Sequence, residues 1–399
     1  MAPDSARVAV AEIDYVARAE ALAPRIAAAS AQMERERRLL PDVLDALHEA
    51  GLFRLLLPRA QNGGEIDPLT HFRVIETIAK ADASTAWCLG QGGGCAMSAA
   101  YLDPAIAWKI FGSDPRAVLA WGPDPKARAI VDGDGYRVTG TWAFNSGGRH
   151  ATWLGAHCPI YEADGTTVRR HADGTRVERT MLVPASEVPW TDIWNVTGLR
   201  GTASDAYSLT DHFVRHDHSI TRDFTKECRE SGQLYRLSAM ALYETAFSGV
   251  ALGIARAALD SFIELAATKV PRGKKSPIRD NAVVQSGLAQ AEACVASARV
   301  YLLNALASIW ESVRAPGASF TLEHRMAMRL ASTHAIHQAR DAVDFAYNAA
   351  GASAIFDGHP LERRFRDIHT VTQQLQGRAA HFETVGAWIL NGDPDLTFV

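Results

Sequence analysis

Long segments with apolar residues at helical spacing dominate the chain from about residue 230 onward. An apolar stripe that recurs every three to four residues marks one face of a helix, and such faces become stable when they pack against one another. Short polar loops separate the segments, and this arrangement predicts a four-helix bundle. The four segments are 236–268, 282–314, 322–350 and 367–390.

The pattern upstream of the bundle changes once. It is helical from about residue 7, and after about residue 116 short β-branched and aromatic runs alternate with Asp-Gly and Gly-Gly turns. Such runs are typical of antiparallel strands and hairpins. We therefore expect a mainly α fold with a small β domain. The expected parts are an N-terminal helical domain over 1–115, a middle antiparallel β domain over 116–220 and a C-terminal four-helix bundle over 221–399.

The composition argues against several kinds of partner. With 41 Lys and Arg residues against 45 Asp and Glu, the formal net charge is −4, which gives no electrostatic basis for binding nucleic acid. No stretch approaches the roughly 20 apolar residues that a membrane span needs. The Met1 end lacks the features of a signal peptide, and the five scattered cysteines suit reduced thiols. These features favour a cytoplasmic protein.

No metal site is expected. A four-helix bundle can hold a di-iron centre, but the Glu-x-x-His motif of such centres does not occur in the sequence. His334 and His337, with Asp341 one turn on, are possible ligands, but no third convergent ligand is apparent. A polar or subunit-facing side of a helix explains these residues more simply.

The stretch GTWAFNSGGRHATW, residues 140–153, is the strongest candidate for a binding site. An aromatic strand runs into a turn that carries Asn145 and Ser146, and a second aromatic strand follows. Such a turn exposes backbone N–H groups and a hydroxyl at a sheet edge, where a flat ring could stack and take hydrogen bonds from them. A plain hairpin turn is the alternative.

Four stretches, taken in order, resemble the acyl-CoA dehydrogenase superfamily, and the resemblance extends over nearly the whole chain. It implies an N-terminal helical domain, a middle β domain, a C-terminal four-helix bundle and a homotetramer. It also implies a flavin in the cleft between the β domain and the bundle, partly across a subunit boundary. The stretches are VTGTWAFNSGGRHATW (138–153), WNVTGLRGTASD (194–205), SPIRDNAVVQSGLAQAEA (276–293) and RRFRDIHTV (363–371).

The resemblance also implies roles for individual residues around the flavin. The turn residues that would contact the flavin are Trp142, Asn145, Ser146 and Gly147. The loop that would cover the ring is formed by Arg200, Gly201 and Thr202. A basic loop would lie near a flavin phosphate of a neighbouring subunit, although a solvated turn explains it equally well; its residues are Arg272 and either Lys274 or Lys275.

The dehydrogenases of this superfamily use a carboxylate to remove a proton next to a thioester carbonyl. By resemblance, this base stands shortly after the Arg-Asp pair of the last stretch, where this chain has Leu375. A second position, on the first bundle helix, aligns with Tyr243, and Glu244 follows it. One residue is about 100° of helix rotation, so Glu244 becomes a candidate base only with the register shifted by one. The chain thus fits acyl-CoA dehydrogenation poorly.

The monooxygenase branch of the superfamily fits the turn better. Its members receive reduced flavin from a separate reductase, and their turn resembles FNSGGRHATW. Ser146 would be the hydrogen-bond partner near the reacting edge of the flavin. Gln374 stands where this branch often has a histidine, and a glutamine cannot shuttle a proton. His150 is a possible substitute; a strand-edge histidine bonded to a nearby loop is its alternative interpretation.

We therefore expect a flavin-dependent monooxygenase that uses reduced FAD or FMN and O₂ on a small, largely apolar molecule. Its candidate catalytic residues are Ser146, His150 and Gln374. The first alternative is a dehydrogenase that oxidises a thioester with Glu244 as the base. The second is a flavin-binding protein without catalytic activity, because a fold does not fix an activity.

Overall fold

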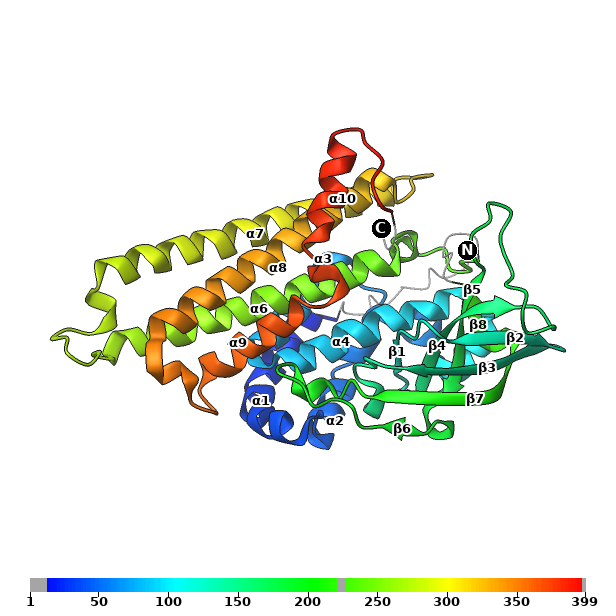
Figure 1. The fold of residues 1–399 in the computed structure, drawn as a ribbon, viewed down its shortest axis with the longest axis horizontal. Coiled ribbons are helices and arrows are strands. Elements are labelled where there is room, and N and C mark those ends of the chain that lie inside the picture. The colour runs from blue at the N-terminus through cyan, green and yellow to red at the C-terminus, as the bar shows by residue number, and fades with distance from the viewer. Residues whose placement is uncertain (1–12, 222–226, 397–399) are drawn as a thin grey trace, which may run out of the picture.

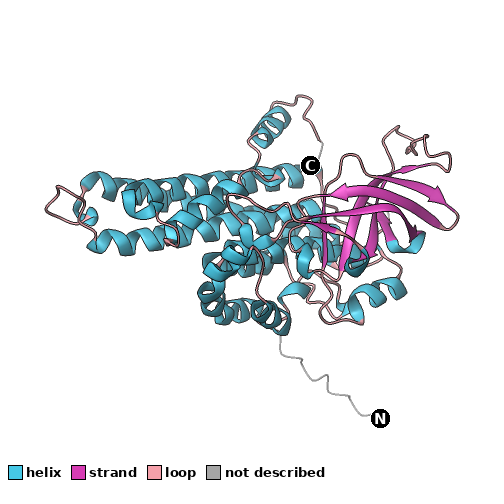
Figure 2. Cartoon of the chain, turned by 60° about the horizontal axis from the view of Figure 1, so that its bottom comes forward, coloured by secondary structure: helices cyan, strands magenta, loops and turns pink. Residues whose placement is uncertain are grey.

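The computed structural model of the protein describes residues 13–221 and 227–396. The expectation of no signal peptide at Met1, and the start of the helical pattern near residue 7, fall outside the described residues. Figures 1 and 2 show a long helical body with a β sheet packed against one end of it. The larger apolar core joins the N-terminal helices to the bundle, and a smaller core belongs to the sheet.

Four of the five N-terminal helices begin at an aspartate that caps them, and α2 begins at Leu40 without a side-chain cap. Asp67 accepts hydrogen bonds from the first turn of α3, and Asp82 accepts one from the N–H of Thr85 in α4. These side chains satisfy N–H groups that have no partner inside the helix. The helices are α1 (Tyr15–Glu36), α2 (Pro41–Glu49), α3 (Pro68–Ala81), α4 (Ala83–Ala96) and the short α5 (Pro104–Ala107).

α4 is buried along nearly its whole length because it is made of small residues. A Cβ atom at Gly90 would lie 2.8 Å from the Cβ of Ala246, and one at Gly94 would lie 2.3 Å from the ring of Tyr243. Both contacts are closer than real Cβ atoms allow. Glycine at these positions therefore lets the first bundle helix approach α4.

The strands between residues 119 and 221 form one eight-stranded sheet. Its order is β6-β7-β3-β2-β4-β5-β8, with β1 paired to β4. Most pairs are antiparallel, as expected, but β4 runs parallel to both β1 and β2. The strands are β1 (Leu119–Gly122), β2 (Arg128–Asp132), β3 (Gly135–Trp142), β4 (Trp153–Tyr161), β5 (Glu178–Pro184), β6 (Trp190–Thr191), β7 (Ala206–Arg215) and β8 (Ser219–Thr221).

The C-terminal half is helical, and three of its helices are long. Within the described residues, α7 is the one helix whose length and apolar composition would suffice to cross a membrane, a test that core helices of soluble proteins also pass. In the single chain α7 leaves Val283 and Val300 exposed. The helices are α6 (Ala239–Thr268), α7 (Ala282–Arg314), α8 (Leu322–Ala350), α9 (Pro360–Val371) and α10 (Ala380–Ile389).

The expectation of one continuous helix over 367–390 is wrong. The chain instead forms α9, a short 3-10 turn at Leu375–Gly377, and α10. Gln374 interrupts the helix because its side-chain oxygen accepts a hydrogen bond from the N–H of Gln376 and caps the short turn. Gln374 and Gln376 therefore do not lie on a common helix.

Candidate functional site

The turn after β3 leaves an aromatic ring on the surface. Phe144 has a φ of 58° and is 62% exposed, and its ring meets that of Trp194 edge-on. Trp142 is instead fully buried, stacked on Tyr207, with its indole N–H donating to the carbonyl of His157. The left-handed backbone at Phe144 ends the alternation of side chains between the two faces of the sheet, and it turns this ring outward. Phe144, rather than the expected Trp142, is thus the aromatic residue available to a ligand.

Two backbone hydrogen bonds tie the turn to the loop at 199–205. The N–H of Asn145 donates to the carbonyl of Asp205 at 3.3 Å, and the N–H of Gly147 donates to that of Thr202 at 3.0 Å. Gly147 has a φ of 78°, which favours glycine. The side chain of Asn145 is buried, and its two polar atoms have no hydrogen-bond partner within residues 13–221 and 227–396. A role for Asn145 in flavin binding stays a prediction.

A row of hydroxyl groups connects the turn to the loop and to α4. The indole N–H of Trp87 donates to Oγ of Ser146 at 3.0 Å. Oγ of Ser146 lies 2.7 Å from Oγ of Ser204, which lies 2.7 Å from Oγ1 of Thr202. The Thr202 hydroxyl donates to the carbonyl of Leu199 at 2.8 Å. The structure therefore brings the predicted Ser146 and Thr202 together through Ser204.

One carboxylate fixes the loop beside the turn. Oδ2 of Asp205 accepts a hydrogen bond from Nε of Arg149 at 2.7 Å, and Oδ1 accepts from the N–H groups of Ile193 and Trp194 at 3.0 and 3.1 Å. Asp205 is buried, so these charge-assisted bonds are shielded from water. The loop is thereby held against the turn.

The loop is also anchored to the bundle. Oδ1 of Asp367, in α9, accepts a hydrogen bond from the N–H of Leu199 at 2.7 Å, and burial raises the pKa of Asp367 to about 7. Gly201 packs closely on Ser84 of α4. The guanidinium of Arg200 donates to the carbonyl of Val196, and its Nε lies 3.6 Å from a carboxylate oxygen on α1. Of the expected loop, Gly201 and Thr202 lie against α4, whereas Arg200 turns toward α1.

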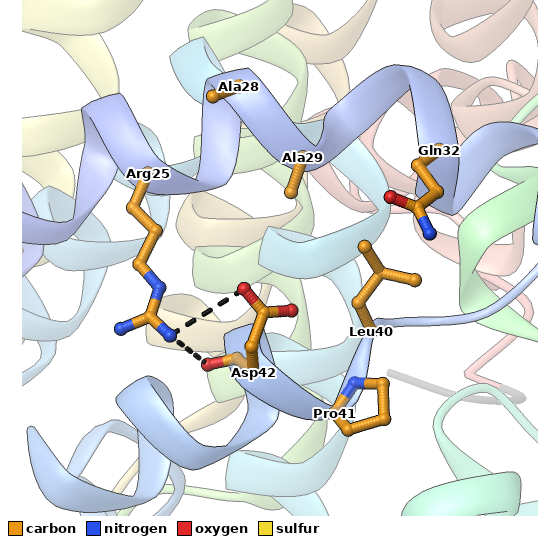
Figure 3. Close-up of a pocket in the computed structure, with 7 residues that line it drawn as sticks. All are labelled: Arg25, Ala28, Ala29, Gln32, Leu40, Pro41 and Asp42. Atoms are coloured by element: carbon orange, nitrogen blue, oxygen red, sulfur yellow. Dashed lines mark hydrogen bonds and ion pairs between the residues drawn. The ribbon is translucent and has the colours of Figure 1, made fainter.

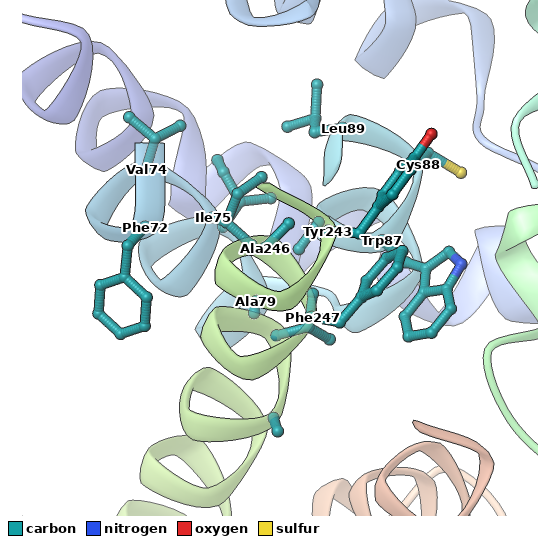
Figure 4. Packing of buried hydrophobic residues seen from close by; sticks show 14 of the residues in the cluster. Phe72, Val74, Ile75, Ala79, Trp87, Cys88, Leu89, Tyr243, Ala246 and Phe247 are labelled. Atoms are coloured by element: carbon teal, nitrogen blue, oxygen red, sulfur yellow. The ribbon is translucent and has the colours of Figure 1, made fainter. Parts of the chain in front are cut away.

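Three stacked rings form a wall between α4 and α6 (Figure 4). The rings of Trp87 and Phe247 lie 4.0 Å apart between centroids, and those of Phe247 and Tyr243 lie 5.7 Å apart and nearly parallel. Sγ of Cys95 lies 3.4 Å from the hydroxyl of Tyr243. Because Trp87 also donates to Ser146, this apolar wall joins the turn directly. All three rings are buried in the single chain, so they form part of the apolar core beside the turn.

His150 and Gln374 are the two candidates for polar contact with a substrate, and their side chains make different contacts. His150 packs on Phe53 with centroids 5.4 Å apart, and burial lowers its pKa to about 3, so it is neutral at neutral pH and a weak base. Gln374 uses its side-chain oxygen as a cap for Gln376, which leaves its NH₂ group for other partners. Neither residue has a hydrogen bond to Ser146, and their catalytic roles stay predictions.

Glu244 faces α8 within the bundle. Its Oε1 accepts a hydrogen bond from Nε of Arg329 at 2.7 Å, and both side chains are buried. Burial raises the pKa of Glu244 to about 7, against the opposing effect of Arg329. Tyr243, one residue earlier, faces α4. The two neighbours thus point to different helices, as one step of helix rotation requires.

The basic loop lies far from the turn. Arg272 and Lys274 belong to the connection between α6 and α7, which Figure 1 shows at the end of the helical body opposite the sheet. One chain therefore does not bring these residues to its own Ser146.

Two surface pockets border α1, and neither includes Ser146. The pocket in Figure 3 lies between α1 and α2, where Arg25 and Asp42 form an exposed ion pair at 3.6 Å. The second adjoins the 192–205 loop, with Arg149, Trp194 and Asp205 among its lining residues. The ion pair of Arg149 with the buried Asp205 belongs to the second pocket.

Sequence reasoning missed three residues of this site. Phe144 stands inside the turn, and its exposure depends on the left-handed backbone at its own position, which the aromatic pattern does not reveal. Ser204 stands inside the stretch at 194–205, and its part in the hydroxyl row appears only once the loop lies on the turn. Trp87 stands 59 positions before Ser146, and no local pattern links the two.

These groups fit a flat ring with a polar edge. Phe144 offers an exposed apolar face, and Ser146 offers a hydroxyl oxygen at the junction of sheet and helices. A ring in this position would lie against apolar residues with a few polar groups to orient it, which is the usual make-up of a cofactor site.

Sequence models of two acyl-CoA dehydrogenase domains match the chain. The N-terminal domain matches residues 15–103 and the C-terminal domain matches residues 245–376, together more than half of the chain. The chain belongs to the acyl-CoA dehydrogenase superfamily.

Comparison with known proteins places the chain in the flavin-dependent monooxygenase branch of this superfamily. Indole-3-acetate monooxygenase of Pseudomonas putida is 28% identical over 91% of this chain and 90% of its own. The oxygenase subunit HsaA of a flavin-dependent monooxygenase of Rhodococcus jostii is 28% identical over 88% of this chain and 91% of its own. The structure of XiaF from Streptomyces, in complex with FADH2 and glycerol, has a TM-score of 0.88 at 25% identity over 96% of each chain. The protein is an oxidoreductase of the flavin-dependent monooxygenase branch, and its cofactor is a flavin.

Proposed function

We propose that this protein is the oxygenase component of a two-component system. It takes reduced FAD or FMN from a separate reductase and uses O₂ to oxygenate a small, largely apolar molecule. The flavin supplies the chemistry with O₂, while the chain binds it, orients the substrate and excludes water. The observation that carries this proposal is the convergence of α4, the turn and the covering loop on the hydroxyl of Ser146. The name of the Rhodococcus relative, an oxygenase subunit, supports a separate reductase.

We assign the contacts with the flavin to the turn and its covering loop. Phe144 offers its ring to the flavin face, Ser146 meets the polar edge, and Gly147, with its positive φ, lets the backbone turn beside it. Gly201 and Thr202 hold the covering loop on α4 and the turn. The stacked wall of Trp87, Phe247 and Tyr243 then borders the substrate, with the NH₂ group of Gln374 as a polar contact.

The functional unit that we propose is a homotetramer in the cytoplasm. Because the basic loop lies far from the turn of its own chain, Arg272 and Lys274 would act on a flavin held by a neighbouring subunit. Apolar side chains exposed on α7, on α10 and at the residue that follows α10 give such neighbours a surface to bury; they are Val283, Val300, Tyr301, Ile389 and Leu390. The five cysteines are all free, which suits a reducing compartment.

The alternative function is a thioester dehydrogenase, which needs a carboxylate base. The structure does not support such a base at either candidate position. Glu244 is engaged by Arg329 on the side of α6 that faces away from α4. The other position for a base is Leu375, which has no titratable group. Neither of these two positions thus supplies a carboxylate toward α4.

The test is oxygen incorporation. Purified protein is given photoreduced FMN or FAD, isotopically labelled O₂ and indole-3-acetate as the first probe, with indole and resorcinol as further probes. We expect labelled oxygen in at least one product, detected by mass spectrometry. Protein that carries tightly bound oxidised flavin and oxidises a thioester, with Glu244→Gln abolishing that turnover, would contradict the proposal.

A further inference from the structure

Three buried polar side chains link α6 to the short turn that separates α9 from α10. Oε1 of Glu244 in α6 accepts a hydrogen bond from Nε of Arg329 in α8 at 2.7 Å. Nη1 of Arg329 lies 3.0 Å from Nδ1 of His381 in α10, and Nε2 of His381 lies 2.6 Å from the carbonyl oxygen of Leu375. All three side chains are buried. They form the Glu244–Arg329–His381 relay, which ends on the 375–377 turn.

The partners of His381 define its protonation. The guanidinium of Arg329 can only donate, and it lies nearer to Nδ1 than to Nε2 of His381, at 3.0 against 3.5 Å. The carbonyl of Leu375 can only accept, and its two lone pairs accommodate both Nε2 of His381 and the N–H of Arg378 at 3.4 Å. Burial lowers the pKa of His381 to about 4, and the charge of Arg329 acts in the same direction. His381 is therefore neutral at neutral pH, with its proton on Nε2.

The 375–377 turn carries a buried amide beside the stacked wall. Nε2 of Gln376 lies 3.1 Å from Sδ of Met240 on α6. Met240 stands three and seven residues before Tyr243 and Phe247, so all three share one face of α6. A thioether sulfur can only accept, so the NH₂ group of Gln376 faces it. The amide oxygen of Gln376 is buried and has no partner among the residues that the structure describes. Because buried polar atoms are nearly always paired, this oxygen points to a ligand that donates a hydrogen bond.

We infer that the Glu244–Arg329–His381 relay positions the 375–377 turn, and through it the amides of Gln374 and Gln376, against the substrate. The inference rests on the function proposed above, in which the substrate lies beside the stacked wall. Glu244 directly follows Tyr243, so the relay ties the turn to the helix that carries two rings of this wall. Its members are positioning residues, because each of them acts through the turn.

The relay is the strongest of the contacts that hold the turn. The other two carbonyls of the turn accept hydrogen bonds from Thr333 and His337 of α8, at 3.4 and 3.0 Å, against 2.6 Å for His381. Only the ring of His381 is held in turn by a buried ion pair, and connected hydrogen bonds of this kind reinforce one another. Without His381, the carbonyl of Leu375 keeps only the long bond from the N–H of Arg378.

The first experiment measures the turn itself and needs no substrate. Hydrogen exchange of the full-length protein is followed by mass spectrometry on peptides that contain the 375–377 turn. His381→Phe keeps an aromatic ring and removes both hydrogen bonds, whereas the amide of His381→Gln can donate to Leu375 and accept from Arg329. We expect the amides of the turn to exchange about tenfold faster in His381→Phe, the scale of one buried hydrogen bond, and at nearly the wild-type rate in His381→Gln.

The matched control is His334→Phe, also in the bundle. The ring of His334, on α8, meets that of Tyr301 rather than the turn, so exchange at residues 375–377 should stay as in the wild type. Unchanged exchange in His381→Phe would overturn the inference.

The second experiment measures what the turn does for the substrate. The probe is whichever of indole, indole-3-acetate and resorcinol gives most labelled product, since each has an N–H or O–H group that can donate to Gln376. Electrons that do not oxygenate the probe leave as H₂O₂, so the ratio of product to H₂O₂ reports how well the probe is oriented. We expect this ratio to fall about tenfold in His381→Phe and to recover in His381→Gln, with the affinity for reduced flavin unchanged.

The outcomes separate this inference from the proposed function. A wild-type ratio in His381→Phe, in which the turn exchanges faster, would overturn the inference and leave the proposed function intact. Product from none of the three probes in the wild type would contradict the proposed function, and with it the role of the turn toward a substrate.

The double variant Glu244→Leu/Arg329→Met separates positioning from folding. It removes both buried charges together, so the fold keeps most of its stability, but it leaves Nδ1 of His381 without its donor. We expect about threefold faster exchange in the 375–377 turn and a lower ratio of product to H₂O₂, at a midpoint of urea unfolding close to that of the wild type. Wild-type exchange and a wild-type ratio would show that Glu244 and Arg329 only stabilise the bundle, and would overturn the relay.

Discussion

Glu244 follows the position that aligns with a dehydrogenase base. In the structure its carboxylate accepts a hydrogen bond from Arg329. We predict that Glu244→Gln leaves reduced-flavin binding unchanged and lowers the free energy of unfolding by about 3–5 kcal/mol, because it leaves a buried guanidinium without its counter-charge. Urea unfolding and flavin titration measure the two quantities. The double variant Glu244→Leu/Arg329→Met should recover most of the lost stability. Normal stability together with lost turnover would mark Glu244 as a base after all.

His71 gives a pH-dependent prediction at the same scale. It is fully buried, and burial lowers its pKa from 6.5 to about 4. The unfolded chain therefore binds this proton more readily between those values, so the stability present above pH 6.5 is lost as the pH falls toward 4. Relative to His71→Leu, the wild type should lose about 2 kcal/mol between about pH 7 and pH 5. Urea unfolding of both proteins at each pH measures this; a pH-independent difference would show that His71 is not neutral in the fold.

The residues of the site show how far sequence reasoning reaches. Ser146 and Thr202 were predicted because each stands in a stretch with a recognisable pattern. Trp87 and Ser204 were not, since their roles depend on the way that α4 and the loop meet the turn. The hydroxyl row ends at the carbonyl of Leu199, which also accepts a hydrogen bond from Nε1 of Trp194, and a backbone acceptor leaves no trace in the sequence.

Among the elements, the strands and the first three long helices follow from their periodicity, but the break between α9 and α10 does not. The apolar pattern runs through the break. The break is stabilised by side chains from other segments that form hydrogen bonds with the carbonyl oxygens of residues 375–377. These carbonyls are bonded by His381, Thr333 and His337 at 2.6, 3.4 and 3.0 Å. Such long-range partners are invisible to a local pattern.

The close approach of α4 and α6 gives a prediction about an element. Gly94→Ala would place a Cβ 2.3 Å from the ring of Tyr243, and relief requires that the ring or the helix move. We expect a loss of about 1–3 kcal/mol in the free energy of unfolding, as for other overpacked cores. Gly386→Ala in α10 is the matched control, because nothing lies within 4 Å of its added Cβ. A neutral Gly94→Ala, measured by thermal unfolding, would mean that the helices are not packed this tightly.

At the scale of the whole molecule, the chain separates two groups of residues that one flavin would need. The turn lies where the sheet meets the helices, and the loop between α6 and α7 lies at the opposite end of the body (Figure 1). Arg272 and Lys274 are exposed in this loop of the single chain. The proposed tetramer resolves this separation, because the loop of one subunit can reach the turn of the next.

Complementation between subunits tests this arrangement. Gly147→Val should disable the turn, because its φ of 78° strains a β-branched residue. Arg272→Glu/Lys274→Glu should disable the basic loop, since the reversed charges repel a flavin phosphate. Each variant alone should bind reduced flavin weakly, whereas tetramers refolded from a mixture should regain binding at sites that combine an intact turn with an intact loop. If both groups serve the flavin of their own chain, no mixed site is intact, and titration of the mixture would show no recovery.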